Sequence, residues 1–565
     1  MMRQSKHGVC LLALVALDAF PLQDNAGFVT RVENVLAHEA LRQRVQLSAK
    51  PPSKEHLSGG EFNQQVTGSA SVSEMLQVLH TERYNPNYNL IIVSAAWHTM
   101  ARLQHSITRQ VVADPYFDEF MQDTLQILKR SLVQDPGCWS RQSANLFWAS
   151  AKLSRQSVVK RHLAKVQADF SEAAACTAFN MDEQGVANVI WACSELNLPR
   201  ATLRKIMNAV TYRLRDVAEE LKPQGTSNIL LAAVRLGKEA PQLLDEMELL
   251  AEVLPDKIAA MDAQAVANSI WATTRLERQA EGAALLTVLP DLVRRAEVVV
   301  GNMNGQNVAN IIWSAAKLRN RPPELLELMP RLTNRGGKII GQLDSQNVAN
   351  IFWATSKLQE EAPSLQYFLP NMTRRAEAVI TQMDVEGSAS TILAVGQLQS
   401  DDKLFLRNLL PGLTQRMFFI LQHSPPREMS NACWGLALSG HADIDFMNSV
   451  AAELVARADQ MKPKSVEYDM PQILISFARL GIPGPPDFLD IVHRKQRPML
   501  KRMNAWGLCA LSWSCKRLDD SGKFRDFCTM VNQQVATRGF SQQEVEYSRF
   551  GPEKWSQRPR KKRSK

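Results

Sequence analysis

An amide and a basic side chain recur at fixed positions in a segment that the chain repeats many times. Close copies are QSANLFWASAKL, QGVANVIWACSEL, QAVANSIWATTRL, QNVANIIWSAAKL and QNVANIFWATSKL, which end at Leu153, Leu196, Leu276, Leu318 and Leu358. With the tryptophan as position 0, position −3 is asparagine in seven of ten copies, and position +4 is lysine or arginine in seven of ten. An amide both donates and accepts hydrogen bonds, and a basic side chain suits phosphate. The pattern therefore favours repeated recognition of a polymer.

Positions −3 and +4 lie on one side of a helix, because seven residues span about two turns. We expect stacked copies to form two parallel rows, in which amides contact bases or a polymer backbone and cations contact phosphate. The predicted nucleic-acid-binding residues are Asn145, Lys152, Asn188, Asn228, Arg235, Asn268, Arg275, Asn310, Lys317, Asn350, Lys357, Asn431, Arg479 and Arg517. In the alternative, the amides bond to the neighbouring repeat and the cations only complement the helix dipole. The tryptophan is expected in the core, with base stacking as its alternative.

The elements that position these residues follow from the spacing of the copies. Position 0 falls at 148, 191, 231, 271, 313, 353, 393, 434, 475 and 513, with a looser copy around Trp97. A period near 40 with helix-type patterns is typical of stacked helix pairs. We predict an all-α fold, an α-solenoid of about eleven such pairs. Recurrent prolines in the second helix of each pair, at Pro290, Pro330, Pro370 and Pro411, are expected at a first turn or a kink.

Composition and local patterns predict four regions. Arg3 and Lys6 precede an apolar stretch from Val9 to Leu17, which is shorter than the roughly 20 residues that cross a bilayer. An organelle targeting leader is expected there, with an ordinary amphipathic helix as the alternative. The predicted regions are a leader at 1–22, a partly disordered linker at 23–75, the repeat domain at 76–535 and a basic disordered tail at 536–565.

The net charge of +9 is concentrated at one end of the chain. Residues 551–565 contain seven basic residues and one acidic residue, so the rest of the chain is close to neutral. Any nucleic-acid surface on the repeats must therefore be a local stripe. The tail residues predicted to add non-specific affinity are Arg558, Arg560, Lys561, Lys562 and Arg563. A solvated terminus or a nuclear-type signal is the alternative.

The composition, with 45% apolar and 22% charged residues, excludes wholesale disorder, collagen and multi-span membrane architectures. The eight cysteines and ten histidines lack metal-ligand or catalytic spacing, and no phosphate loop or nucleophile elbow is present. We therefore expect neither an enzyme nor a cofactor, a metal, a membrane association or a small-molecule substrate. The string Gly59-Gly60-Glu61-Phe62 matches the signature of diguanylate cyclases, but that signature needs a hairpin in an α/β domain, so we interpret it as coincidence.

The repeated VANIIWA…KL segment, from Trp97 to Leu518, resembles the helical-repeat proteins of organelle RNA metabolism. These include octotricopeptide-repeat proteins, the leucine-rich region of FAST-kinase-like and RAP-domain proteins, and the subunit-six family of the RNA-editing substrate-binding complex. The chain departs from them in two ways. Its C-terminus has no RAP-like pattern, and Pro322-Pro323-Glu324 lacks the tryptophan of the octotricopeptide Pro-Pro-Glu-Trp element. A known base-reading code therefore cannot be transferred.

The resemblance implies an adaptor that binds single-stranded RNA in a mitochondrion or a plastid. It would support RNA processing, editing, stability or ribosome assembly, together with other proteins of such a complex. The alternative is an armadillo-type scaffold, in which asparagines hold an extended peptide by its backbone and tryptophans flank its side chains. A nearly neutral body fits that scaffold well.

Overall fold

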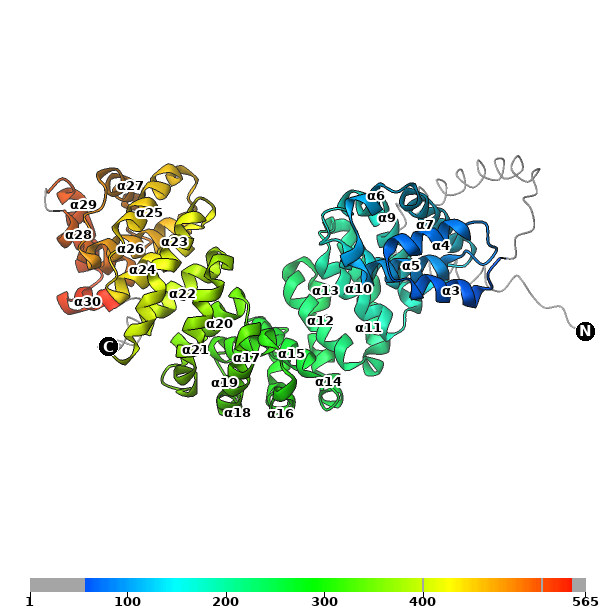
Figure 1. Ribbon diagram of the computed structural model, residues 1–565. Helices are drawn as coiled ribbons and strands as arrows, with labels where there is room; N and C mark the ends of the chain where they lie inside the picture. Colours follow the sequence, from blue (N-terminus) through cyan, green and yellow to red (C-terminus); the bar gives the residue numbers. More distant parts are fainter. Residues whose placement is uncertain (1–55, 399–400, 520–521, 551–565) are drawn as a thin grey trace, which may run out of the picture. The chain divides into compact units, whose positions relative to one another are not determined.

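The computed structural model describes residues 56–398, 401–519 and 522–550, and it is all-helical across them (Figure 1). The leader predicted at 1–22 and the basic tail residues from Arg558 to Arg563 lie outside these residues. The chain divides at Val217 and Ala218 into two compact units, which we call unit 1 and unit 2. Within the described ranges, no helix is both long enough and apolar enough to cross a membrane.

Unit 1 consists of helix pairs. The first member of each pair, the A helix, is α3 (Gly59–Gly68), α5 (Leu90–Arg102), α8 (Ser140–Leu153) or α10 (Glu183–Glu195). The second member, the B helix, is α4 (Val72–Thr81), α7 (Pro115–Gln134), α9 (Lys160–Thr177) or α11 (Arg200–Val217). Short connecting elements are η1 (Gln104–Ser106), α6 (Arg109–Ala113), η2 (Pro136–Trp139) and η3 (Ala178–Asn180).

Unit 2 continues the same pattern. Its A helices are α12 (Pro223–Leu236), α15 (Ala263–Leu276), α17 (Gly305–Lys317), α20 (Ser345–Leu358), α22 (Val385–Gln397), α24 (Pro426–Ser439), α26 (Pro463–Leu480) and α28 (Ala505–Leu518). Its B helices are α14 (Met247–Ile258), α16 (Leu289–Val299), α19 (Met329–Lys338), α21 (Ser364–Val379), α23 (Leu410–Phe419), α25 (Ile444–Ala456), α27 (Pro486–Gln496) and α29 (Arg525–Thr537). Shorter elements are η4 (Ala218–Glu220), η5 (Gly237–Glu239), α13 (Pro241–Leu244), η6 (Ala283–Thr287), η7 (Val300–Asn302), α18 (Pro323–Glu327), η8 (Ile340–Gln342), η9 (Ile380–Gln382), η10 (Asp401–Leu409), η11 (Leu421–His423), η12 (Ala458–Gln460), η13 (Arg497–Met499), α30 (Gln542–Tyr547) and η14 (Ser548–Phe550).

The helices form two layers in each unit. Within a unit, successive A helices pack on one another, as α5 does on α8 and α8 on α10 in unit 1, and α15 on α17 and α17 on α20 in unit 2. The B helices pack side by side in the same way, as α9 does with α11 and α23 with α25. Many packed helices in this arrangement are consistent with an α-solenoid.

Aspartate or asparagine caps set where the A helices begin. The Asp344 carboxylate, for example, accepts the backbone N–H of Asn347 at 2.8 Å, which satisfies one of the free donors of the first turn. The cap residues of this kind are Asn89, Asp182, Asp262, Asn304, Asp344, Asp384 and Asn504. Six of the seven stand nine residues before position 0, so they fix which side of the helix each later residue faces.

A recurring arginine ties each of many B helices back to the start of its own A helix. The Nε of Arg335 on α19 donates to the carbonyl oxygen of Met303, 2.8 Å away and just before α17. Equivalent bonds join Arg213 to Met181, Arg295 to Met261, Arg375 to Leu343, Arg416 to Met383, Arg457 to Ser424 and Arg538 to Met503. These arginines hold the helix pair closed and therefore serve the fold.

Two glycines allow α22 and α24 to approach closely. A Cβ added at Gly435 would lie 2.5 Å from the carbonyl oxygen of Ile392, and one added at Gly396 would lie 2.4 Å from the carbonyl oxygen of Gly435. Both positions face backbone atoms, which cannot move aside as a flexible side chain can.

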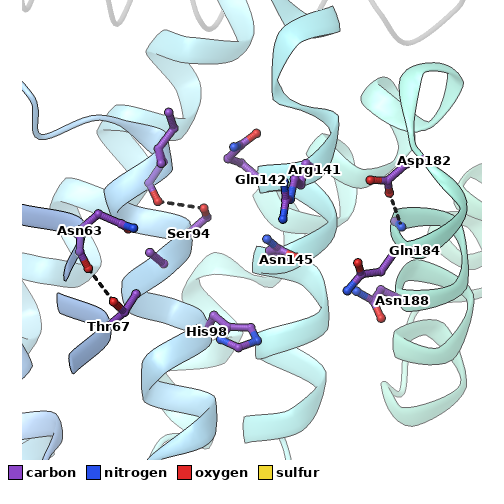
Figure 2. Close-up of a pocket in the computed structure, with 13 residues that line it drawn as sticks. Asn63, Thr67, Ser94, His98, Arg141, Gln142, Asn145, Asp182, Gln184 and Asn188 are labelled. Atoms are coloured by element: carbon purple, nitrogen blue, oxygen red, sulfur yellow. Dashed lines mark hydrogen bonds between the residues drawn. The ribbon is translucent and has the colours of Figure 1, made fainter. Parts of the chain in front are cut away.

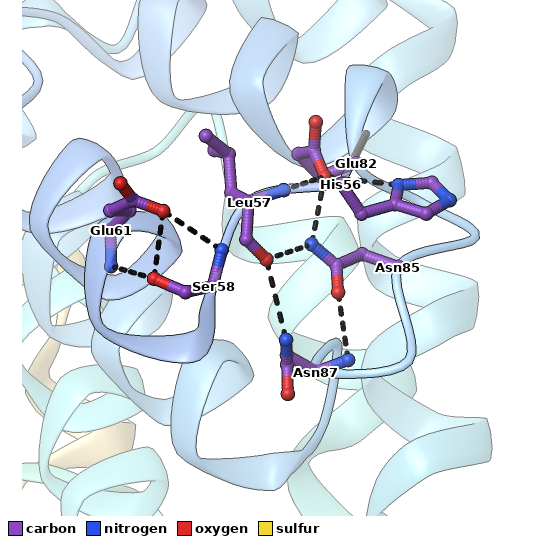
Figure 3. Close-up of polar contacts among 7 residues, drawn as sticks. All are labelled: His56, Leu57, Ser58, Glu61, Glu82, Asn85 and Asn87. Atoms are coloured by element: carbon purple, nitrogen blue, oxygen red, sulfur yellow. Dashed lines mark hydrogen bonds and ion pairs between the residues drawn. The ribbon is translucent and has the colours of Figure 1, made fainter. Parts of the chain in front are cut away.

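The linker predicted at 23–75 is wrong for residues 59–75, because α3 and the start of α4 lie there. Figure 3 shows the reason: Ser58 Oγ accepts the N–H of Glu61, and the Glu61 carboxylate accepts the N–H of Ser58 at 3.0 Å. The Ser58 hydroxyl also donates to the Glu61 carboxylate at 2.7 Å, and this bond, with that from the Ser58 N–H, holds the pKa of Glu61 below its ordinary value. Phe62 and Val66 are fully buried, so the helix joins the core. Gly59 and Gly60 thus open a helix and no hairpin forms.

The predicted disordered tail is wrong at its beginning as well. Gln542–Tyr547 form α30, which starts with the same reciprocal bond pattern between Ser541 and Glu544. The proline prediction is confirmed for Pro290, Pro330 and Pro411, which stand in the first turns of α16, α19 and α23, whereas Pro370 lies inside α21.

Candidate nucleic-acid interface

One stripe of each regular A helix reaches solvent, and it carries the residues singled out by the repeat. In α20, Asn350, Trp353 and Lys357 are half-buried, while the residues between them are buried. In α17, Asn310 and Trp313 are half-buried and Lys317 is exposed. We call the side of the A layer formed by these stripes the A-helix surface. The expectation that positions −3 and +4 share a face is met on these helices.

The asparagines at position −3 form no hydrogen bond to a neighbouring repeat among the described residues. Within the described residues, no hydrogen bond is made by the side chains of Asn145, Asn188, Asn228, Asn268, Asn310 and Asn350. None of these amides has an atom that is both sealed from solvent and unpaired. Asn268, 9% exposed, is the most buried of them. The amides of these six asparagines are therefore available to a ligand. The seventh, Asn431, differs, because its Nδ2 donates to the Glu428 carboxylate at 3.3 Å.

The cations of unit 2 lie over tryptophan rings of two successive A helices. The guanidinium of Arg275 lies 5.5 Å from the centre of its own Trp271 ring and 5.9 Å from that of Trp313. The ammonium of Lys317 lies 5.9 Å from Trp313 and 5.6 Å from Trp353. The rings of successive helices are 6.0–6.4 Å apart at interplanar angles of 34–36°. These distances are typical of cation–π contacts, which fix each charge between two helices.

These tryptophans are not core residues. Trp148, Trp191, Trp271, Trp313 and Trp353 are all half-buried, whereas Trp97, Trp434 and Trp513 are buried. The expectation of a core tryptophan is therefore wrong for the first five. Lys152, Arg275 and Lys317 lie over these rings, so part of each ring face is covered and less of it is accessible to a stacked base.

Like charges gather around Lys317. Partial desolvation lowers the pKa of Lys317, and the positive charges of Arg278, Arg275, Arg427 and Lys357 lower it further. Within the described residues, Arg275, Arg278 and Lys317 form no ion pair with a carboxylate. A bound anion would relieve this repulsion, so the site is suited to phosphate or another polyanion group.

Carboxylates lie farther along the A layer of unit 2. Glu428 and Asp469 are both desolvated, which raises the pKa of each, and the negative charge of Glu386 raises that of Glu428 further. These three acidic residues belong to α24, α26 and α22. The positive row of unit 2 therefore comes from α15, α17 and α20, and its Lys357 donates from Nζ to Gln397 Oε1 at 3.2 Å.

A C-terminal segment covers the last part of the A-helix surface. Trp513 Nε1 donates to the Glu546 carboxylate at 3.2 Å, and Trp506 Nε1 donates to the carbonyl oxygen of Ser548 at 3.3 Å. Arg479 donates to the carbonyl oxygen of Arg549 at 2.6 Å. Residues 546–549 thus cover, on α26 and α28, the stripe whose equivalent on α15, α17 and α20 reaches solvent.

The other predicted cations are placed as follows. Arg479 is half-buried and desolvation lowers its pKa, while its guanidinium lies 5.7 Å from the Trp434 ring. Arg517 is exposed and lies 3.8 Å from the centre of the Trp513 ring. Arg235 is exposed on α12, where Leu231 stands in place of the tryptophan. These three do not join the row that surrounds Lys317.

In unit 1, Lys152 lies between the rings of Trp148 and Trp191, at 5.8 and 5.2 Å from their centres. Asn145 and Asn188 line a cavity of about 430 Å³ (Figure 2). The structure therefore brings the predicted residues of this unit together on one surface.

Sequence reasoning missed a third polar row, at position −7. Glutamine stands there in five successive copies and is exposed in each: Gln184, Gln224, Gln264, Gln306 and Gln346. The recurrent Q at the head of the repeated segment was the available signal. Arg141 and Arg427 occupy the same position in other copies, whereas Arg278 has no repeat signal.

No family model matches the chain, and no curated protein matches it. Within the described ranges, no group of three histidine, cysteine or carboxylate side chains is arranged to hold a metal ion.

Proposed function

We propose that this chain binds single-stranded RNA along its A-helix surface and acts as an adaptor in organelle RNA metabolism. Processing, editing, stability or ribosome assembly in a mitochondrion is the setting that the repeat resemblance suggests, with a plastid as the alternative. We also propose that the all-helical fold is an α-solenoid of about eleven helix pairs with a period near 40, to which α3 and α4 add a pair at the N-terminal side.

The observation that carries the proposal is the row formed by Arg275, Lys317 and Lys357 on successive A helices. The first two are held over tryptophan rings, lack a carboxylate partner within the described residues, and lie close enough for their charges to act on one another. Packed helices lie about 8–10 Å apart, so the row offers cations at a short and regular spacing. A polymer with a regularly spaced negative backbone fits such a row.

The amides favour a single strand over a duplex. Apart from that of Asn431, the carboxamides of the asparagines at position −3 and of the glutamines at position −7 form no hydrogen bond among the described residues. They can bond to the edges of bases, which are accessible only where bases are unpaired. In this arrangement phosphates contact position +4, and base edges contact the asparagines and glutamines. The tryptophan positions the cation, so base stacking on its face is a smaller contribution.

The test is a fluorescence-anisotropy titration of single-stranded RNA with the Arg275→Ala/Lys317→Ala variant. We expect its affinity to fall about tenfold or more, since charge-assisted bonds to two phosphates are lost. The slope of log affinity against log salt should become shallower by about 1.4, at roughly 0.7 per phosphate for a single strand.

The matched control is Lys338→Ala/Arg374→Ala, which removes the same charges from two exposed positions on the B helices α19 and α21. It should bind as the wild type does. Equal weakening by both variants would reduce the effect to net charge, and absence of RNA binding in the wild type would refute the proposal.

A second candidate function is supported by the segment 546–549. Polypeptide carbonyls and a carboxylate are bound there by Arg479, Trp506 and Trp513, which are contacts that an armadillo-type scaffold would make with a peptide. A chain ending at residue 540 should, on this alternative, bind a synthetic peptide of residues 541–550 supplied separately. Competition between that peptide and RNA would favour one shared surface, whereas tight peptide binding without RNA binding would favour the scaffold.

A further inference from the structure

Unit 1 contains a cavity whose lining differs from the cation row of unit 2. It has a volume of about 430 Å³ and is lined by residues of α3, α5, α8 and α10 (Figure 2). This volume lies within the range of about 300–1,000 Å³ that small-molecule sites occupy. The cavity is therefore large enough for one planar polar group with its attached substituents.

Four carboxamides line this cavity. Gln142 and Asn145 belong to α8, and Gln184 and Asn188 belong to α10, as Figure 2 shows. Within the described residues, none of these four side chains forms a hydrogen bond. Each amide offers a donor and an acceptor side by side, so together they can match a mixed pattern of donors and acceptors.

The cavity has few charges. Arg141 is exposed and pairs with no carboxylate among the described residues, while the Asp182 carboxylate accepts the backbone N–H of Gly185 at 2.7 Å. Burial and the positive charge of Arg102 lower the pKa of His98, which favours the neutral form of its ring. This ring lies parallel to that of Trp148, at 5.2 Å and 20°.

We propose that the cavity selects the base of one unstacked nucleotide in the bound RNA, an inference that rests on the proposed function. The amides of Asn145, Asn188 and their glutamine neighbours bond to the base edge, and Arg141 holds an adjoining phosphate. Base choice then resides in unit 1, whereas the row of Arg275 and Lys317 supplies affinity for any sequence.

The chemistry of the lining distinguishes a base from other ligands. A phosphate accepts hydrogen bonds only, so half of the capacity of each amide would be unused, whereas a base edge presents donors and acceptors together. A carboxamide paired by two bonds discriminates between bases by about 5-fold to 150-fold. One such site can therefore set a measurable preference on a chain that otherwise binds RNA by its phosphates.

The experiment compares oligo(U), oligo(A) and oligo(C) of one length, titrated with the full chain and with Asn145→Ala/Asn188→Ala. The wild type should prefer one oligomer by at least about fivefold. The variant should lose that preference by weakening only the preferred oligomer. Gln142→Ala/Gln184→Ala, which changes a half-buried and an exposed side chain, provides a second variant and should have the same effect.

The matched control is Asn334→Ala/Asn371→Ala, which removes two amides from exposed positions on the B helices α19 and α21 and should leave the preference unchanged. A wild type that binds all three oligomers equally, or a preference that survives in both unit 1 variants, would overturn the inference. Nucleoside monophosphates at the same concentration should not displace the RNA, and displacement by one of them would show a free-nucleotide site instead.

Failure of the inference can be told apart from failure of the proposed function. If no oligomer binds the wild type, the proposed function fails. If oligomers bind, and Arg275→Ala/Lys317→Ala weakens all of them while the unit 1 variants change nothing selectively, only the assignment of base choice to the cavity fails.

Discussion

The ammonium of Lys317 lies 5.6 Å from the centre of the Trp353 ring, which belongs to the next A helix along the chain. Its distance from the ring of its own helix, Trp313, is almost the same at 5.9 Å. A charge that would otherwise move on a long flexible stem is thus held at the junction of two helices. This placement links the packing of the fold to the chemistry of its surface.

The contact between Lys317 and the Trp313 ring should be measurable as a coupling energy. Trp313→Leu and Lys317→Met, made singly and together, should show a coupling of about 0.5–1 kcal/mol in urea unfolding, which is typical of an exposed cation–π pair. The control cycle combines Trp313→Leu with Lys338→Met on the B helix α19, where no contact exists. Coupling of the same size in both cycles would contradict the assigned contact.

Asparagines that serve a ligand should be dispensable for folding. Asn310→Ala should raise the free energy of unfolding by roughly 0.5 kcal/mol, because alanine is the better helix former and no hydrogen bond is lost. Thermal unfolding followed by circular dichroism measures the change. A loss of 1 kcal/mol or more would indicate that the amide stabilises the stack.

The arginines of the B helices should show the opposite behaviour. Arg335→Ala should destabilise the fold by about 1–3 kcal/mol, since the Met303 carbonyl loses its charged donor. Lys338→Ala, on the same helix but exposed, should stay within about 0.5 kcal/mol of the wild type. Equal stability of the two variants in urea would rule out a structural role for Arg335.

Because α22 and α24 pack closely, we expect one methyl group added at Gly435 to lower the free energy of unfolding strongly. Gly435→Ala should cost at least about 1–3 kcal/mol, because its Cβ would meet the Ile392 carbonyl. Gly337→Ala in α19, where a Cβ would meet nothing, should stabilise the fold by roughly 0.5–1 kcal/mol. A tolerated Gly435→Ala would show that the two helices can separate at little cost.

His493 should make the free energy of unfolding depend on pH. Burial against Phe524 and Phe527 lowers its pKa to about 4 from 6.5, although Asp490 and Asp519 act in the opposite direction. Between these values the unfolded chain binds more protons than the folded one, so the free energy of unfolding falls as the pH falls from 6.5 to 4.

The His493→Leu variant tests this assignment in urea unfolding at pH 6.5, 5.5 and 4.5. Removing the titrating ring should reduce the loss of stability across this window. If the wild type and the variant lose the same free energy between pH 6.5 and 4.5, another group is responsible.

Periodicity revealed much of the fold, because every A helix must bury the same apolar face and so keeps the same residue types. The helix α3 was missed because Gly59 and Gly60 suggested a linker, although Ser58 and Glu61 form a capping box that the sequence does show. The capping box satisfies free N–H groups of the first turn and so favours a helix start despite the two glycines.

The candidate site was predicted in part. The rows of amides and cations share one surface of the A layer, yet the sequence could not show that Glu428 ties up Asn431 or that residues 546–549 cover Trp513. The cover over Trp513 is a tertiary contact that no repeat pattern encodes, whereas Glu428 and Asn431 lie one turn apart on α24 and their bond involves a residue outside the repeated pattern. The cavity of unit 1 likewise depends on how the packing of α8 and α10 places Asn145 and Asn188 in one lining.

Arg275 and Lys317 each lie over the tryptophan ring of the next A helix as well as over that of their own. Each cation site of the proposed binding surface is therefore formed jointly by two successive helix pairs. Excision of residues 305–344 would let Asn304 cap the helix that begins at Ser345 and would bring Arg275 against Trp353. The shortened chain would then keep a complete cation site between the two joined helix pairs. A cut in the middle of an A helix would instead disrupt the sites on both sides of that helix. On the proposed function, tandem duplication or loss of whole pairs would change the length of bound polymer in discrete steps, without redesign of any contact.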